Sequence, residues 1–334
     1  MRAHVSRAHI FAVVLATTAA LVLVPSPALA TEYSCDLAGL EQAINDTGGP
    51  HTFDCAGPST IQTTGNYLVI NQVVELDGEG LLTIEIQPDP FSRLFLVGGP
   101  AAELILHNLA ITGGYVGNDA GGAIIVGGSA QAHLHNVDIH DNSAGEGGAV
   151  AVQGGAFLRV FESSLHDNTA GDGGAVALSE GSEALIQAST VSSNVAMGNP
   201  VTDRRGNGGG IWAVENSTTR LEGSVVNANS AAWHGGGIFV HSSDLSMFDT
   251  AISDNTANKS GGGLYGGNVS TVDVTASDIS SNGSRNGGGI YTWDSQLVVD
   301  VSSITDNHAL IWDGGGVQMT AELGVASATI TETY

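Results

Sequence analysis

A short motif recurs along the chain at a nearly fixed spacing: Asp-Asn-Ser/Thr-Ala, a brief loop, Gly-Gly-Gly/Ala and an aliphatic residue. Measured at the last small residue of each copy, successive motifs are 26, 26, 35, 27, 26, 26 and 27 residues apart. A period of this length is the signature of a solenoid, in which every repeat is one structural unit that packs on the next. The aligned residues are Ala123, Ala149, Ala175, Gly210, Gly237, Gly263, Gly289 and Gly316.

Each repeat contains segments that alternate with period two, for example residues 157–160 and 271–274. Alternation with β-branched residues, broken by Gly and Asn, indicates short strands. At ~3.3 Å per residue, about 26 residues make three short strands with their turns, which is one coil of a parallel β-helix. We therefore predict an all-β, right-handed parallel β-helix of about ten or eleven coils, with equivalent residues stacked ~4.8 Å apart.

Three columns of equivalent residues follow from this registry. The Gly-Gly column is needed where the backbone bends sharply. An aliphatic column that includes Ile111, Ile139, Ile304 and Ile330 is predicted to form the core. Asn tolerates left-handed backbone and bonds turns from within, so the third column is predicted to be a structural ladder. Its members are Asn142, Asn168, Asn194, Asn229, Asn255, Asn282 and Asn307.

The Gly-Gly-Ala-Ile/Val and Asp-Asn-Thr/Ser-Ala elements resemble the polymorphic outer membrane protein repeats of bacterial surface proteins, within the pectin-lyase-like β-helix class. The resemblance covers about residues 105–330. It implies cell-surface display and adhesion, and it brings no catalytic motif.

Residues 1–30 have the features of a secretory signal peptide. Arg2 and Arg7 supply the charged start, residues 10–24 are apolar but too short to span a bilayer comfortably, and small residues precede a cleavage site after Ala30. The alternative is a retained membrane anchor. We expect a secreted or cell-surface protein whose mature chain has no membrane span.

The charge of the mature chain restricts its partners. Removing Arg2 and Arg7 from the nine basic residues leaves seven against 34 acidic ones, and therefore a net charge of −27. Such a surface repels nucleic acid and anionic membranes, so we expect no nucleic-acid partner.

Cys35 and Cys55 are predicted to form a disulfide, because an exported chain meets an oxidising environment. Leu37, Leu40 and Ile44 fall on one helical face between them. Residues 31–65 are accordingly predicted to be a cap with a short helix that covers the open first coil, and residues 66–334 the β-helix.

Two irregularities interrupt the period. The interval of 35 residues is longer than the others because of extra residues at 199–207, which form either a tolerated loop or a functional contact. At the other irregularity the sequence stops in mid-coil after Ile330. Either assembly covers this coil or the sequence is a fragment.

An aromatic column is the first candidate site. Trp212, Phe239, Tyr265 and Tyr291 lie two residues after the aligned glycines and alternate with aliphatic residues that should point inward. One interpretation is structural stacking of the rings. The other is an exposed strip that binds an extracellular polysaccharide or cell-surface glycan, flanked by a second column of Trp233, Lys259, Arg285 and Trp312.

A polysaccharide lyase is the alternative function. Some β-helix lyases that cut acidic glycans place a Lys base and an Arg on neighbouring coils, and Lys259 and Arg285 are 26 residues apart. Mutual repulsion would lower the pKa of the lysine. The Gly-His-Gly and paired-Asp sets of polygalacturonases and the Arg-x-Pro-x-x-Arg set of pectate lyases are missing. A purely structural display module is the third reading.

Metal binding has weaker support. The column of Asp141, Asp167, Asp254 and Asp306 could share Ca²⁺, but solvated turn residues beside the Asn ladder are the favoured interpretation. His140 and His166 should stack one coil apart, and two histidines without a third ligand make a weak case for a metal site. No cofactor is predicted to be required.

Overall fold

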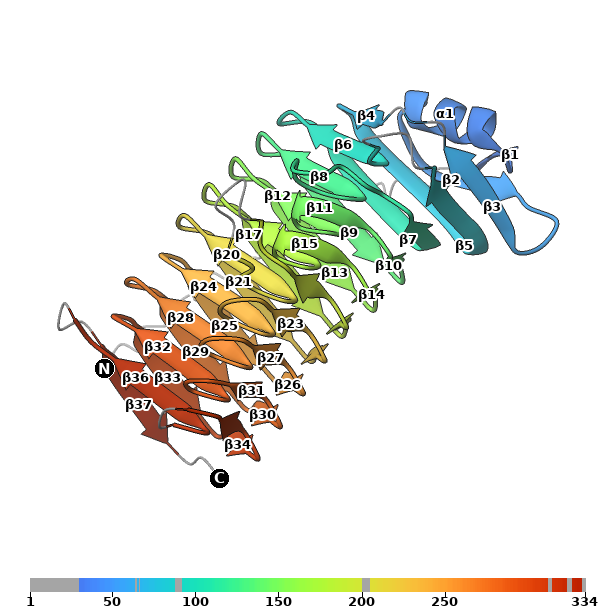
Figure 1. Ribbon diagram of the computed structural model, residues 1–334. Helices are drawn as coiled ribbons and strands as arrows, with labels where there is room; N and C mark the ends of the chain where they lie inside the picture. Colours follow the sequence, from blue (N-terminus) through green and yellow to red (C-terminus); the bar gives the residue numbers. More distant parts are fainter. Residues whose placement is uncertain are drawn as a thin grey trace, which may run out of the picture.

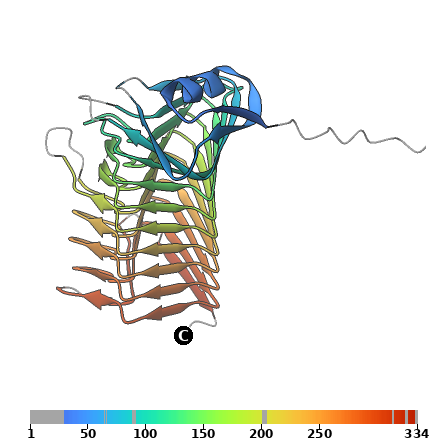
Figure 2. The ribbon, with the colours of Figure 1, turned by 90° about the vertical axis from the view of Figure 1, so that its right-hand side faces the viewer.

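The chain forms an elongated solenoid in the computed structural model, with a helix at one end and flat coils stacked along the whole length (Figures 1 and 2). The structure describes residues 30–63, 65, 67–87, 92–199, 205–311, 314–322 and 326–331. Every strand pairing between its named strands is parallel, and the strands of the described residues fall into three sheets, A, B and C. The predicted parallel β-helix is confirmed.

Each coil contributes one strand to sheet B, and in the repeated coils this strand follows the Gly-Gly bend. Its ten strands in the described part of the chain are β4 (Leu68–Ile70), β6 (Phe95–Gly98), β8 (Ile124–Gly127), β12 (Val150–Val152), β16 (Val176–Leu178), β20 (Ile211–Val214), β24 (Ile238–His241), β28 (Leu264–Gly267), β32 (Ile290–Trp293) and β36 (Val317–Thr320).

Sheet A follows sheet B, as one long strand in the early coils (Val73–Ile86 and Glu103–Thr112) and as a pair of strands separated by a bend from Gln131 onward. Its described strands are β1 (Thr31–Ser34), β2 (Gly48–Asp54), β3 (Ser59–Thr63), β5 (Val73–Ile86), β7 (Glu103–Thr112), β9 (Gln131–His135), β10 (Asp138–His140), β13 (Phe157–Phe161), β14 (Ser164–His166), β17 (Glu183–Gln187), β18 (Thr190–Ser192), β21 (Thr218–Glu222), β22 (Val225–Asn227), β25 (Asp244–Phe248), β26 (Ala251–Ser253), β29 (Thr271–Thr275), β30 (Asp278–Ser280), β33 (Gln296–Asp300), β34 (Ser303–Thr305) and β37 (Ser327–Thr331).

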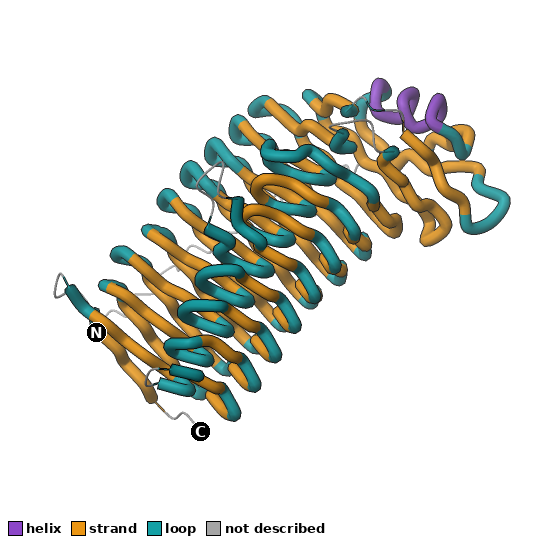
Figure 3. Tube along the Cα trace, viewed as in Figure 1, coloured by secondary structure: helices purple, strands orange, loops and turns teal. Residues whose placement is uncertain are grey.

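Sheet C closes the coil with the shortest strands, separated by loops (Figure 3). Its described strands are β11 (Ser143–Glu146), β15 (Thr169–Asp172), β19 (Val195–Ala196), β23 (Ser230–Ala231), β27 (Thr256–Ala257), β31 (Gly283–Ser284) and β35 (His308–Ala309).

Vertical registry holds across the long interval as well as the regular ones. Val150 pairs with Val176, which pairs with Ile211 although these two are 35 residues apart. The extra residues are therefore looped out without shifting the register of sheet B. Of this insertion, residues 200–204 lie outside the described residues. Gly206 and Asn207 end it, and their backbone N–H groups donate to Asp172 Oδ1 at 3.1 and 2.6 Å.

The asparagine column is a hydrogen-bonded ladder inside the coils, as predicted. From Asn142 to Asn282 each amide Nδ2 donates to the Oδ1 of the next Asn, for example Asn229 to Asn255 at 3.0 Å, and to a backbone carbonyl of the preceding coil, here Val191 at 2.9 Å. The backbone N–H of Asn229 also donates to Asn255 Oδ1 at 2.9 Å. These buried amides satisfy the turn backbone beside an otherwise apolar core.

One predicted rung is wrong. Ile330 does not stack on Ile304, because β37 pairs with β33 and sets Ile330 opposite Val299. The spacing from Val299 to Ile330 exceeds the usual period, since the loop between β36 and β37 is longer than its equivalents. Sequence spacing alone misplaces a residue whenever a loop changes length.

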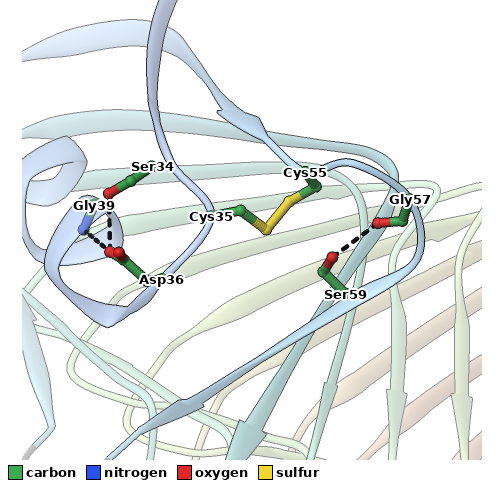
Figure 4. Close-up of a disulfide and its surroundings, with 7 residues drawn as sticks. All are labelled: Ser34, Cys35, Asp36, Gly39, Cys55, Gly57 and Ser59. Carbon is green, nitrogen blue, oxygen red and sulfur yellow. Dashed lines mark hydrogen bonds between the residues drawn. A yellow bond between two sulfur atoms is a disulfide. The ribbon is translucent and has the colours of Figure 1, made fainter.

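The N-terminal end is covered by α1 (Leu37–Asn45), which packs Leu40, Ala43 and Ile44 onto the core. Asp36 caps this helix by accepting a hydrogen bond from Gly39 N at 2.8 Å. Cys35 and Cys55 form the predicted disulfide with their Cα atoms 5.1 Å apart, and it ties the start of the helix to the end of β2 (Figure 4). β2 and β3 already pair with β5, so sheet A extends into the predicted cap.

Candidate functional site

The four predicted aromatic residues form one column on the outer side of sheet B. Trp212 pairs with Phe239, Phe239 with Tyr265, and Tyr265 with Tyr291, on β20, β24, β28 and β32 (Figure 1). Their neighbours Ile211, Ile238, Leu264 and Ile290 are fully buried in the main core, whereas the aromatic rings form a separate cluster. The predicted alternation and registry are therefore confirmed.

The column is not the exposed strip that the sequence suggested. Phe239 and Tyr265 are each only 7% exposed. The Phe239 and Tyr265 rings are stacked at 5.0 Å and 7°, and the Tyr265 and Tyr291 rings at 5.4 Å and 8°. Because these spacings are close to the coil repeat, each ring face is covered by the next ring and only edges can face solvent. Trp212 and Tyr291, at the two ends, are partly exposed.

A histidine that the sequence analysis missed covers the middle of this column. The His234 ring lies 4.4 Å from the Tyr265 ring and 6.4 Å from the Phe239 ring. Burial, with a smaller contribution from the charge of Lys259, lowers the pKa of His234 to about 3. His234 is therefore a neutral, packed ring at any ordinary pH. Burial also raises the pKa of Tyr265, so its hydroxyl stays protonated.

The cluster crosses the coil as well as following the axis. In one coil the contacts run from Trp233 to His234 at 5.7 Å, on to Phe239, and from Phe239 to His241 at 6.1 Å. Two coils later Trp293 lies partly exposed on the same face, two residues after Tyr291. Strand alternation alone could have identified Trp293, whereas His234 lies in a loop whose path the sequence does not fix.

The flanking column brings cations beside this cluster. Lys259 Nζ lies over the Trp233 ring, 4.2 Å from its centroid, in a cation–π contact. Arg285 belongs to the following coil, where Asn286 N donates to the Lys259 carbonyl at 3.0 Å, and both cationic residues are exposed. Lys259 thus leans toward the preceding coil, away from Arg285. Trp312, the last member of the predicted column, lies outside the described residues.

The aspartate column consists of turn residues. Asp141, Asp167, Asp254 and Asp306 all have a positive φ of 53–56°, and Ser193, Ala228 and Ser281 adopt the same conformation between them. The column is thus defined by left-handed backbone, which Asp tolerates well. Among the described residues, no three His, Cys, Asp or Glu side chains are grouped so as to hold a metal ion.

The predicted histidine pair is present on sheet A. His140 and His166 are stacked at 5.1 Å and 9°. Asp167 Oδ2 lies 2.7 Å from His166 Nδ1, and Asp138 Oδ1 lies 2.9 Å from its Nε2. Burial opposes protonation of His166, but these two carboxylates outweigh it and raise the pKa of the imidazole. The arrangement is an ion-paired surface histidine.

Comparison with known proteins agrees with the architecture. The family described as "Right handed beta helix region" matches residues 101–256. The fold is a right-handed parallel β-helix. No curated protein matches the sequence of this β-helix. Among solved structures, the crystal structure of PfbA, a surface adhesin of Streptococcus pneumoniae, is similar with a TM-score of 0.42 and 11% identity, over 91% of this chain and 92% of that chain.

No helix in the described part of this β-helix has the length and apolar character needed to cross a membrane. The likeness to polymorphic outer membrane protein repeats stays a prediction from the motifs.

Proposed function

We propose that this β-helix is a secreted or cell-surface protein that binds an extracellular polysaccharide at the outer face of sheet B. The apolar, signal-like start of the sequence supports export. The disulfide between Cys35 and Cys55 supports an oxidising destination, because disulfides are rare in the cytosol. The acidic surface repels a densely charged polyanion such as nucleic acid, so an acidic polysaccharide is expected to bind only where Lys259 and Arg285 offset this charge locally.

The observation that carries the proposal is the contact between Trp233 and Lys259 beside the partly exposed rings of Trp212 and Tyr291. These four residues are called the rim below. Phe239 and Tyr265 form the closed base of this rim, and their role is to fix Trp212 and Tyr291 at its ends. Partly exposed indole and phenol rings offer apolar edges to sugar rings. Lys259 and Arg285 add two cations that can pair with a carboxylate or sulfate group of an acidic sugar.

Retention on immobilised polysaccharides tests this proposal. A panel of acidic and neutral polysaccharides is cast into native gels, and the mobility of the mature protein is measured in each. We expect one or more acidic polysaccharides to retard the protein. Trp233→Ala and Lys259→Ala should each weaken the retention by roughly tenfold or more, the effect expected of an interface hot spot.

The matched control is Phe248→Ala, because Phe248 is an aromatic residue that is 54% exposed on sheet A, away from the rim. Retention should be unchanged in this variant. A wild-type protein that runs freely through every gel, or retention that survives both rim substitutions, would contradict the proposal and favour a structural display module.

The same panel examines the lyase alternative, for which Lys259 and Arg285 lie exposed on neighbouring coils. A lyase would raise the ultraviolet absorbance of an acidic polysaccharide as new double bonds form, and Lys259→Ala would stop the rise. Unchanged ultraviolet absorbance, together with retention of the protein in the gel, would identify a binding protein without this activity.

A further inference from the structure

A cleft of about 200 Å³ lies on the outer side of sheet C, and none of the rim residues lines it. Its base is formed by Gly145 on β11 and Gly171 on β15, which occupy one column because Ala144 pairs with Ala170 and Glu146 with Asp172. In the following coils this column holds Met197, Ala232 and Asn258, as the pairing of their neighbours requires. Two consecutive coils without a side chain therefore leave a hollow in a column that is otherwise filled.

One wall of the cleft is a bulge in the preceding coil. Tyr115 pairs with Ser143 and Ala120 with Glu146, so this coil has two more residues than its partner between the paired positions. Tyr115, 48% exposed, and Asn118 line the cleft from this bulge. Asp119 fixes the bulge through an ion pair with the buried Arg93 and through its carbonyl, which accepts a hydrogen bond from Gly145 N at 2.7 Å.

The opposite wall begins at Met197, the residue that follows Gly145 and Gly171 in the same column. Met197 is 62% exposed and is anchored by its backbone N–H, which donates to the Ala170 carbonyl at 2.8 Å. Asn199 Nδ2 donates to Asn118 Oδ1 at 2.7 Å, a bond that joins the two walls across 81 residues of sequence. The cleft is thus bordered on two sides by segments held in place by hydrogen bonds, and it needs little reorganisation to accept a ligand.

The lining chemistry specifies an uncharged, hydroxylated ligand. The cleft is lined by two asparagine amides, the hydroxyl-bearing Ser143 and Thr169, the Tyr115 ring and the Met197 thioether, and no Asp, Glu, Lys, Arg or His is among the lining residues that the structure describes. Amides offer donors and acceptors together, as vicinal sugar hydroxyls do. The volume is below the roughly 300–1,000 Å³ of pockets for drug-sized ligands, so it suits one ring.

We propose that this cleft binds a single neutral sugar residue, as a free pyranose or as the end or branch of a glycan. The Tyr115 ring lies against the apolar face of the sugar, and Asn118 and Asn199 bind its hydroxyls. This second site shares no lining residue with the rim around Trp233 and does not depend on the polysaccharide binding proposed there.

Saturation-transfer difference NMR of the mature protein with a panel of free neutral monosaccharides tests this site. We expect a signal from at least one pyranose, with a Kd on the order of 1 mM, because a lone small ligand binds weakly. Tyr115→Ala should reduce the signal at least fivefold. The matched control is Tyr67→Ala, because Tyr67 is 52% exposed and does not line the cleft.

A second variant fills the hollow instead of removing a wall. Gly171→Met introduces the residue that the next coil already carries at Met197, and Asn258→Met places the same side chain in the same column outside the cleft. Gly171→Met should abolish the sugar signal and Asn258→Met should leave it unchanged. A panel without any signal, or a signal that persists in both Tyr115→Ala and Gly171→Met, would overturn the assignment. Loss of acidic-polysaccharide retention in the rim variants would leave these results unaffected, so the two proposals fail separately.

Discussion

The coils on either side of the long loop have the same interior and different outer surfaces. Inside, the ladder passes from Asn168 through Asn194 to Asn229 without a change in its bonding, although 35 residues separate the last two. Outside, on sheet B, the earlier coils carry Ala151 and Ala177 where the later ones carry aromatic rings. The inner columns are repeated because every coil has to satisfy the same turn backbone, whereas the outer columns are free to differ.

A second difference lies at the Gly-Gly bend. The earlier coils have Ala149 and Ala175 at the aligned position, both fully buried, and the later coils have glycine. A Cβ atom placed on Gly237 would lie 2.8 Å from the Gly263 carbonyl oxygen and 3.1 Å from the Asn255 amide. The later coils therefore leave too little room for a Cβ atom at this position, and the two halves are not interchangeable there.

The largest expected effect comes from substitutions in the Asn ladder, which both halves share. Asn229→Ala removes the acceptor of two hydrogen bonds from Asn194 and the donor to Val191, all in a buried site. Leaving these groups unpaired should cost about 3–5 kcal/mol of the free energy of unfolding, measured by urea denaturation. Asn168→Ala in the earlier half should cost a similar amount, because Asn168 makes the equivalent ladder bonds and one more, to the His166 carbonyl.

The exposed Asn258 is the control for this pair, and Asn258→Ala should change the stability by less than about 0.5 kcal/mol. A ladder substitution that is tolerated in one half and severe in the other would show that the interiors are not equivalent.

The next effect tests the difference at the bend. Gly237→Ala should destabilise by about 1–3 kcal/mol, because the added methyl group overpacks against the Gly263 carbonyl and the Asn255 amide. The reverse change in the earlier half, Ala149→Gly, should cost about 1 kcal/mol through backbone entropy and lost packing. Both are measured by thermal unfolding. Equal stability of Gly237→Ala and the wild type would mean that the later coils can adopt the geometry of the earlier ones.

These comparisons indicate how far the sequence determines the structure. Spacing translates directly into vertical neighbours, so the Asn ladder, the aromatic column and the stacked His140 and His166 could all be placed from residue numbers. The disulfide between Cys35 and Cys55 was predicted from two cysteines in a chain expected to be exported, and the structure contains it. Ile330 was misplaced because a loop of altered length shifts every later residue.

Exposure could not be derived in the same way. Phe239 and Tyr265 point outward as alternation requires, yet rings stacked at the coil spacing cover one another and a loop residue, His234, covers both. The cleft over Gly145 and Gly171 depends on two loops from distant coils that meet through Asn118 and Asn199. Loop paths of this kind carry no periodic signal, so the candidate sites were only partly predictable.

The smallest expected effect contrasts one histidine from each half. The pKa of His234 is lowered to about 3 in the folded chain. As the pH falls, the His234 side chain is therefore protonated near pH 6.5 in the unfolded chain but only near pH 3 in the folded one. Its contribution to stability is complete above pH 6.5 and is lost as the pH falls toward 3. At 1.36 kcal/mol per pH unit the loss is at most about 2 kcal/mol at pH 5. His234→Phe keeps a ring against Phe239 and Tyr265 and should flatten the fall in thermal stability between pH 7 and pH 5.

His166 should show the opposite sign. Its pKa is raised by Asp167 and Asp138 despite partial burial, so its contribution is complete below pH 6.5 and is lost as the pH rises through the folded-state pKa. His166→Gln should therefore lower the melting temperature more at pH 5.5 than at pH 8, by a small margin because the site is largely exposed to solvent. Parallel pH profiles for the two variants would contradict the distinction between a packed histidine in the later half and an ion-paired one in the earlier half. Opposite slopes would place the difference between the halves in their outer surfaces, since both variants leave the Asn ladder and the aliphatic core unchanged.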